Sequence, residues 1–234
     1  MDSDISMGPV QTSGPLREAI RVYRPPVSEG DESLGTLATY LHMIAILTDV
    51  CEFCFGSDTS SVSGPVGSSK VYRSARWVDV ATELQTWYSS RPESFQSTSV
   101  DARKSAKELP SIKCLSDVGV AANMLYHMSA LQLLSHKPKS SHENIKPSDL
   151  SQALDLEGTP LWHAKSLCGI AIANTQGPWD PLMIAAFYIA ALLLVDVSQQ
   201  TAAMKRFEKL EETGWRVGAL VDRLRQRWAS SKER

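Results

Sequence analysis

The segment from Pro181 to Val197 most constrains the fold of this chain, because its residues are apolar on every side of a helix. A helix of this kind is stable only when neighbouring elements cover it, which predicts a central position in a helical core. Its apolar run, Leu182 to Val195, is about one third shorter than the roughly 20 residues that a bilayer requires. We therefore expect a buried core helix and no membrane span.

Most of the remaining chain has apolar residues at spacings of three and four, which is typical of amphipathic helices. The helices predicted in addition to 181–197 cover residues 34–55, 70–90, 116–135, 160–174, 200–213 and 216–229. Ser33 has the position of an N-cap, Pro160 that of a first-turn proline and Gly214 that of a helix stop. The sequence predicts an all-α protein with a single helical domain, residues 33–230, of about seven helices with an apolar central helix.

Polar segments separate these helices. Residues 1–32 lack a clear period apart from Leu16–Tyr23, so we expect a disordered tail or one short helix. Residues 56–69 are rich in serine and glycine, which predicts a loop. The segment 91–110 is expected to be a loop with one helical turn near Asp101–Glu108, and no segment alternates long enough to predict a sheet.

The four cysteines do not have the spacing of a complete metal site. Cys51 and Cys54 form a CxxC pair, but no second CxxC or histidine pair follows. Positions i and i+3 share one helix face, which predicts core packing, with metal or redox chemistry as the alternative. Because no secretory signal precedes the first helix, we expect reduced thiols and an intracellular, cytoplasmic protein.

The sequence contains no established catalytic or cofactor motif. The patterns HExxH, GxSxG, the P-loop and GxGxxG are all missing. We expect no cofactor and no metal. The formal net charge of −2 gives no electrostatic reason to expect direct nucleic-acid binding.

His127 is the strongest candidate for a catalytic residue, because it follows Tyr126 on a mostly apolar helix. A buried neutral imidazole can exchange a hydrogen bond with a substrate oxygen near neutral pH. His163, beside Trp162 at the start of the next helix, has the same potential. We predict His127, Tyr126 and His163 as catalytic residues, and the alternative for each histidine is a hydrogen-bonded place in the core.

Aromatic residues next to proline-containing turns are candidates for the walls of an apolar pocket. Trp162 and Trp179 flank the helix 160–174 at its two ends. His42 in the first helix and Tyr188 in the apolar helix are the other predicted substrate-binding residues. Core packing is the alternative for these side chains, and it is the expected role of Trp87, Trp215 and Trp228.

Three acidic residues lie where burial would be costly without a partner. Asp196 lies at the end of the apolar helix, and Asp49 and Glu52 lie near the end of the first helix. Asp196 either caps the following helix, pairs with Arg206 or polarises a ligand. The same choice between a structural and a functional role stays open for Asp49 and Glu52.

Four segments of the sequence together form a recognisable pattern. They are LQTWYSSRPESFQS at 84–97, AANMLYHMSALQLLSHKP at 121–138, LWHAKSLCGIA at 161–171, and 204–228 with its Glu-Glu-Thr-Gly-Trp motif. In order and spacing they resemble the helical regulatory domain of fungal zinc-cluster (Zn2Cys6) transcription factors. The resemblance covers residues 35–230 and implies a helical fold with an internal or groove-like small-molecule site.

The resemblance does not extend to DNA binding. Members of that family usually begin with six cysteines that hold two zinc ions, followed by a basic linker. This chain has one CxxC, inside the helical region and without a neighbouring lysine and arginine cluster. We therefore expect that the chain does not itself bind DNA.

Two functions are compatible with these features. The first is a cofactor-independent cyclase, a pericyclase of Diels–Alder type, that holds the reactive conformer of a terpenoid or polyketide intermediate of fungal secondary metabolism in an apolar pocket. The alternative is the effector-sensing regulatory domain of a fungal zinc-cluster transcription factor, which would act in the nucleus. A small apolar metabolite is the expected partner in both cases, and a homodimer or a helical scaffold are further alternatives.

Overall fold

The computed structural model describes residues 32–56, 66–99, 108–138 and 158–232, and this part of the chain is helical apart from one short strand pair. Its α-helices are α2 (Glu32–Phe55), α3 (Val66–Ser90), α4 (Asp117–Ser135), α6 (Pro160–Ala173), α7 (Pro181–Ala191), α8 (Val197–Glu212) and α9 (Gly218–Lys232). A 3-10 turn, η1 (Glu93–Phe95), precedes the strands β1 (Ser97–Ser99) and β2 (Ile112–Cys114). The predicted all-α class is confirmed.

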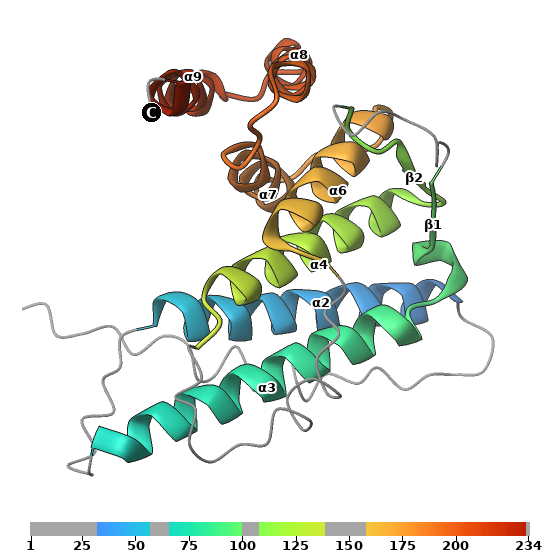
Figure 1. Cartoon of the computed structure of the whole chain (residues 1–234). Coiled ribbons are helices and arrows are strands. Elements are labelled where there is room, and N and C mark those ends of the chain that lie inside the picture. Colours follow the sequence, from blue (N-terminus) through green and yellow to red (C-terminus); the bar gives the residue numbers. More distant parts are fainter. Residues whose placement is uncertain (1–31, 57–65, 100–107, 139–157, 233–234) are drawn as a thin grey trace, which may run out of the picture.

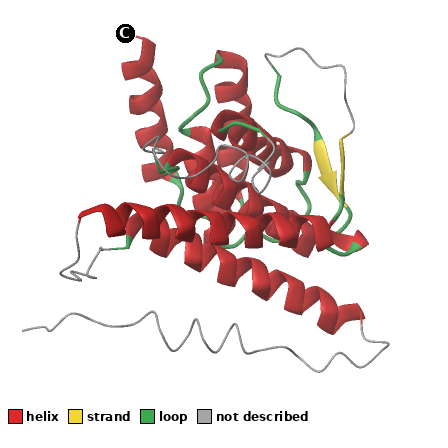
Figure 2. Ribbon diagram, turned by 60° about the horizontal axis from the view of Figure 1, so that its bottom comes forward, coloured by secondary structure: helices red, strands yellow, loops and turns green. Residues whose placement is uncertain are grey.

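The helices are stacked around α4. In Figure 1, α3, α2, α4 and α6 follow one another from the bottom of the view upward, and α7, α8 and α9 are seen almost end-on beyond α6. Helix α4 contacts α2, α3, α6 and α7, and every residue from Gly119 to Leu131 is buried. The strand pair lies at the edge of this helical body (Figure 2). Helix α4 is therefore the most enclosed of the described helices.

The apolar helix predicted over 181–197 ends at Ala191. The chain then turns, and Asp196 becomes the N-cap of α8, where its carboxylate accepts a hydrogen bond from the backbone N–H of Ser198 at 2.8 Å. Leu194 still reaches the core, but Val195 is 75% exposed. The prediction was wrong about the C-terminal part of this segment, and capping is the role of Asp196 that the structure confirms.

Several other predicted boundaries need correction. Helix α2 begins at Glu32, which places Ser33 inside the helix and not at its N-cap. Helix α3 begins at Val66, so the end of the loop predicted at 56–69 is helical. The predicted tail up to residue 31 and the helical turn at 101–107 lie outside the described residues. The antiparallel β1–β2 pair, with Ser97 opposite Cys114, is a feature that the sequence pattern did not predict.

Three buried tryptophans connect helix pairs through their indole N–H groups. Trp77 of α3 donates to a carbonyl oxygen of α4 at 2.8 Å, and Trp87 of α3 donates to one of α2 at 2.9 Å. Trp228 of α9 donates to the last carbonyl of α7 at 3.1 Å. The predicted core positions of Trp87 and Trp228 are confirmed, and Trp215 packs partly buried against the same core.

Helix α2 also has the length and composition of a membrane-spanning helix. Residues Gly35–Phe55 are the one such segment in the described part of the chain. The sequence-based expectation of no membrane span was argued from residues 182–195 only and did not take Gly35–Phe55 into account. In the structure α2 packs on α3 and α4 and buries Met43, Ile46 and Val50 completely, as a core helix does.

Candidate functional site

Two of the predicted catalytic residues, His127 and His163, face each other in the interior. His127 comes from the middle of α4 and His163 from the first turn of α6, and their Nδ1 atoms are 2.9 Å apart. Both side chains are buried. The start of α6 sets this geometry, because Pro160 occupies its first turn and the Thr159 hydroxyl accepts a hydrogen bond from the Trp162 backbone N–H.

Aromatic rings surround the histidine pair on several sides. The Tyr126 ring lies edge-on to His127 and His163, with centroid distances of 5.1 and 6.0 Å. The Trp162 ring approaches the same two imidazoles at 5.5 and 4.8 Å. Tyr88 of α3 stacks on Tyr126 at 4.1 Å. We call Tyr126, His127, Trp162 and His163 the histidine–aromatic cluster; Trp162, 46% exposed, is its outer member.

Protonation of the pair follows from its geometry. Two Nδ1 atoms at 2.9 Å share one hydrogen, so one ring carries its proton on Nδ1 and the other offers the Nδ1 lone pair. Burial lowers the pKa of His127 well below its ordinary value, and the neighbouring His163 and Arg91 charges lower it further. His127 is therefore neutral near pH 7 and able to exchange hydrogen bonds without carrying charge.

The other three predicted site residues have different surroundings. His42 is on the surface of α2, with its Nε2 atom 3.3 Å from Oε1 of Glu83 on α3. The Trp179 ring packs edge-on against Phe187 at 5.9 Å and lies under the guanidinium of Arg206. Tyr188 is partly buried against the hydrophobic core. The structure thus brings together four of the seven predicted residues.

The CxxC pair does not form a metal site with other residues. Cys54 packs against the core as predicted, whereas Cys51 is exposed, so the predicted shared core face was wrong for Cys51. Burial raises the pKa of the Cys54 thiol to about 11. No group of three histidine, cysteine or acidic residues is placed to hold a metal ion within the ranges that the structure describes.

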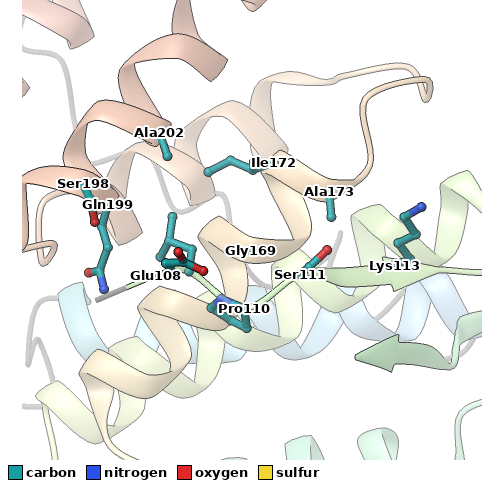
Figure 3. Close-up of a pocket in the computed structure, with 11 residues that line it drawn as sticks. Glu108, Pro110, Ser111, Lys113, Gly169, Ile172, Ala173, Ser198, Gln199 and Ala202 are labelled. Atoms are coloured by element: carbon teal, nitrogen blue, oxygen red, sulfur yellow. The ribbon is translucent and has the colours of Figure 1, made fainter. Parts of the chain in front are cut away.

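A groove of about 540 Å³ lies on the other end of α6, and sequence reasoning missed it. Its walls are the segment leading into β2, the C-terminal half of α6 and the first turns of α8 (Figure 3). The lining residues are Glu108, Leu109, Pro110, Ser111, Lys113, Gly169, Ile172, Ala173, Ser198, Gln199 and Ala202. We call it the α6–α8 groove.

Close backbone contact forms the floor of the α6–α8 groove. A Cβ atom at Gly169 would lie 2.1 Å from the carbonyl oxygen of Pro110, so only glycine lets the 108–111 segment lie this close to α6. Nothing in the sequence pattern distinguishes Gly169 from a weak helix position. The requirement for glycine at position 169 becomes visible only in the structure, where the Pro110 carbonyl lies against this position.

Asn174, the C-cap of α6, connects the three walls. Its Nδ2 donates to the carbonyl of Ile112 at 2.8 Å, and its Oδ1 accepts from the backbone N–H of Cys114 at 3.1 Å. Its own carbonyl accepts from Nη2 of Arg206 on α8 at 3.1 Å. One residue therefore fixes β2 and α8 against the end of α6, and the groove has a defined shape for that reason.

The α6–α8 groove has polar ends and an apolar middle. In Figure 3, Ser198 and Gln199 lie at one end and Lys113 at the other, with Pro110 and Ile172 between them. Such a lining can recognise a small molecule by shape and by a few directed hydrogen bonds or charges.

Comparisons with known proteins do not indicate a function, so the geometry of the histidine–aromatic cluster and the α6–α8 groove is the main guide. No protein-family model, no curated protein and no solved structure matched the chain. The resemblance to the regulatory domain of fungal zinc-cluster transcription factors therefore stays a prediction.

Proposed function

We propose that this chain is a helical protein that binds a small organic molecule in the α6–α8 groove and acts as an effector sensor. The observation that carries the proposal is the groove itself. Its volume of about 540 Å³ falls within the range of roughly 300–1,000 Å³ that is usual for small-molecule sites. Its mixed lining supports binding of a molecule with both apolar and polar parts.

The arrangement of the walls favours sensing. A bound molecule would touch the β2 segment, α6 and α8 at once, and these elements are distant in the sequence. Binding would therefore strengthen the attachment of α8, which Arg206 and Asn174 already join to α6. The resemblance to a regulatory domain supports the same role, with DNA recognition supplied by a zinc-cluster partner and a nuclear location.

Cofactor-independent cyclisation of a terpenoid or polyketide intermediate is the second candidate. The observation in its favour is the histidine–aromatic cluster, in which four residues predicted for that role lie together. A neutral imidazole N–H can donate to an activating carbonyl of a held conformer. His127 and His163 are enclosed, so a substrate would have to displace the partly exposed Trp162 to reach them.

One binding experiment tests the sensing proposal. The purified chain would be titrated with terpenoid and polyketide metabolites and followed by thermal shift and native mass spectrometry. Ala202→Phe places a large side chain in the groove, and we expect it to weaken binding at least tenfold. The matched control is Ala219→Phe, at an exposed alanine of α9 that should leave binding unchanged.

The same samples separate the two candidates. Binding without conversion supports sensing. Conversion at unchanged mass that His127→Gln or His163→Gln abolishes, and Ala202→Phe does not, supports cyclisation at the cluster. Equal binding by the Ala202→Phe and Ala219→Phe variants would show that the groove is not the site.

A further inference from the structure

The charges of the α6–α8 groove are separated along its length. Among its described lining residues, Lys113 carries the positive charge and Glu108 the negative charge. Lys113 follows Glu108 by five positions, so their Cα atoms lie at most roughly 17 Å apart. Lys113 is on β2, opposite Thr98 of β1, and this pairing holds its backbone in place at one end of the groove.

The opposite end offers neutral and acidic hydrogen-bonding groups. Ser198 and Gln199, in the first turn of α8, line this end together with Glu108. A second anionic group would be repelled by Glu108, whereas a hydroxyl group can donate to its carboxylate and accept from the Gln199 amide.

The middle of the groove is apolar. In Figure 3, Pro110 and Ile172 present carbon atoms over this stretch, and the Ser111 hydroxyl lies between Pro110 and Lys113. A flexible hydrocarbon segment of the ligand would lose its contact with water there.

We propose that the α6–α8 groove binds an elongated hydroxy acid, with its carboxylate at Lys113, its hydroxyl at the Glu108–Gln199 end and its hydrocarbon chain over Ile172. This inference rests on the proposed small-molecule function and names the class of ligand. The ligand must make three kinds of contact at once, and each contact can be tested by removing one group from the ligand or from the groove. A small apolar metabolite, the partner expected from the sequence, satisfies only the middle of the groove.

A matched ligand series tests the proposal with the whole chain. The probes are 12-hydroxydodecanoic acid, dodecanoic acid and 1-dodecanol, with binding measured by isothermal titration calorimetry below their micelle-forming concentrations. We expect the hydroxy acid to bind most tightly, dodecanoic acid several-fold more weakly, and dodecanol about tenfold more weakly, because a charge-assisted contact is lost.

Two variants locate the charge contact. Lys113→Met should weaken binding of both acids about tenfold and leave dodecanol unchanged, because the removed ammonium pairs only with a carboxylate. Lys205→Met, at an exposed lysine of α8 outside the groove lining, is the control and should change none of the three affinities.

The outcomes distinguish failure of the hydroxy-acid inference from failure of the proposed binding site. If all three probes bind equally, or if Lys113→Met changes nothing while Ala202→Phe still abolishes binding, the hydroxy-acid inference is wrong and the groove remains the site. If no probe binds, the hydroxy-acid inference is also wrong. If Ala202→Phe leaves probe binding intact, both the inference and the proposed site fail.

Discussion

At the scale of single residues, the histidine pair is a polar contact enclosed in the interior. Its two Nδ1 atoms lie 2.9 Å apart between α4 and α6, where neither imidazole is open to water. A proton added to His127 would be buried next to Arg91 and His163. His127 is therefore stable in its neutral form and costly to protonate.

This cost predicts a pH dependence of stability. The folded-state pKa of His127 is lowered, so below its ordinary pKa of about 6.5 the unfolded chain binds a proton that the folded chain does not. Stability from this source is fully present above pH 6.5 and falls below it, by up to about 1.4 kcal/mol per pH unit. Urea unfolding between pH 7.5 and 5 measures the slope.

The His127→Gln variant provides the comparison for that slope. It removes the titrating imidazole but retains a side chain that can hydrogen-bond to His163. We expect its free energy of unfolding to depend less steeply on pH than that of the wild-type chain over the same interval. Equal slopes would contradict the assignment of the effect to His127.

A second residue-scale prediction concerns the groove floor. Gly169→Ala would bring a methyl group against the Pro110 carbonyl, so we expect a loss of about 1–3 kcal/mol in the free energy of unfolding. Gly35→Ala in α2 is the matched control, because its Cβ would meet nothing within 4 Å. There alanine should stabilise the helix by about 0.5–1 kcal/mol. Urea midpoints that shift equally for both variants would exclude the steric explanation.

At the scale of elements, proline and glycine correctly marked three helix boundaries, whereas the N-cap signal at Ser33 did not. Pro160 and Pro181 lie in the first turns of α6 and α7, and Gly214 follows the end of α8 with a positive φ of 97°. The break after Ala191 could not be predicted, because the residues there are all apolar and include no proline or glycine. Capping of α8 by Asp196 competes with continuation of α7, and the structure shows that capping prevails.

The two candidate sites also differ in how far the sequence could predict them. Residues of the histidine–aromatic cluster carry distinctive chemistry and come from adjacent helices, so they could be named from the sequence. His42 had no such local signal, and the proline-containing turn beside Trp179 did not bring that residue to the cluster. The α6–α8 groove uses Pro110, Gly169 and Ala202, which have no reactive groups. Their role exists only through packing between segments distant in the chain, and periodicity does not record such contacts.

Asn174 supports an element-scale prediction. Asn174→Ala removes the side-chain hydrogen bonds to the Ile112 carbonyl, the Ile170 carbonyl and the Cys114 N–H, which should cost about 2–3 kcal/mol in the free energy of unfolding. Amide hydrogen exchange at Cys114 should also accelerate, because its acceptor is gone. Thr86→Ala removes one exposed hydrogen bond within α3 and is the control, with an expected cost under about 0.5 kcal/mol. Unchanged exchange at Cys114 would mean that Asn174 does not hold β2.

At the scale of the whole molecule, one hydrophobic cluster runs from Met43 in α2 to Trp228 in α9. A continuous core predicts that the described helices unfold as one cooperative unit. Urea curves followed by tryptophan fluorescence and by far-UV circular dichroism should have the same midpoint. Separate midpoints, with loss of the α9 signal first, would instead divide the chain into two folding units.

The indole hydrogen bonds limit the movements available to this molecule. A helix that slides past its neighbour by one turn advances about 5.4 Å, and no indole–carbonyl bond of 2.8–3.1 Å survives such a step. Those bonds hold α3 in register with α2 and α4, and α9 in register with α7. Helix α8 is not among the helices that they join. Under the proposed sensing function, we therefore expect α8 to shift when an effector binds, while α3 and α9 keep their register with their neighbours.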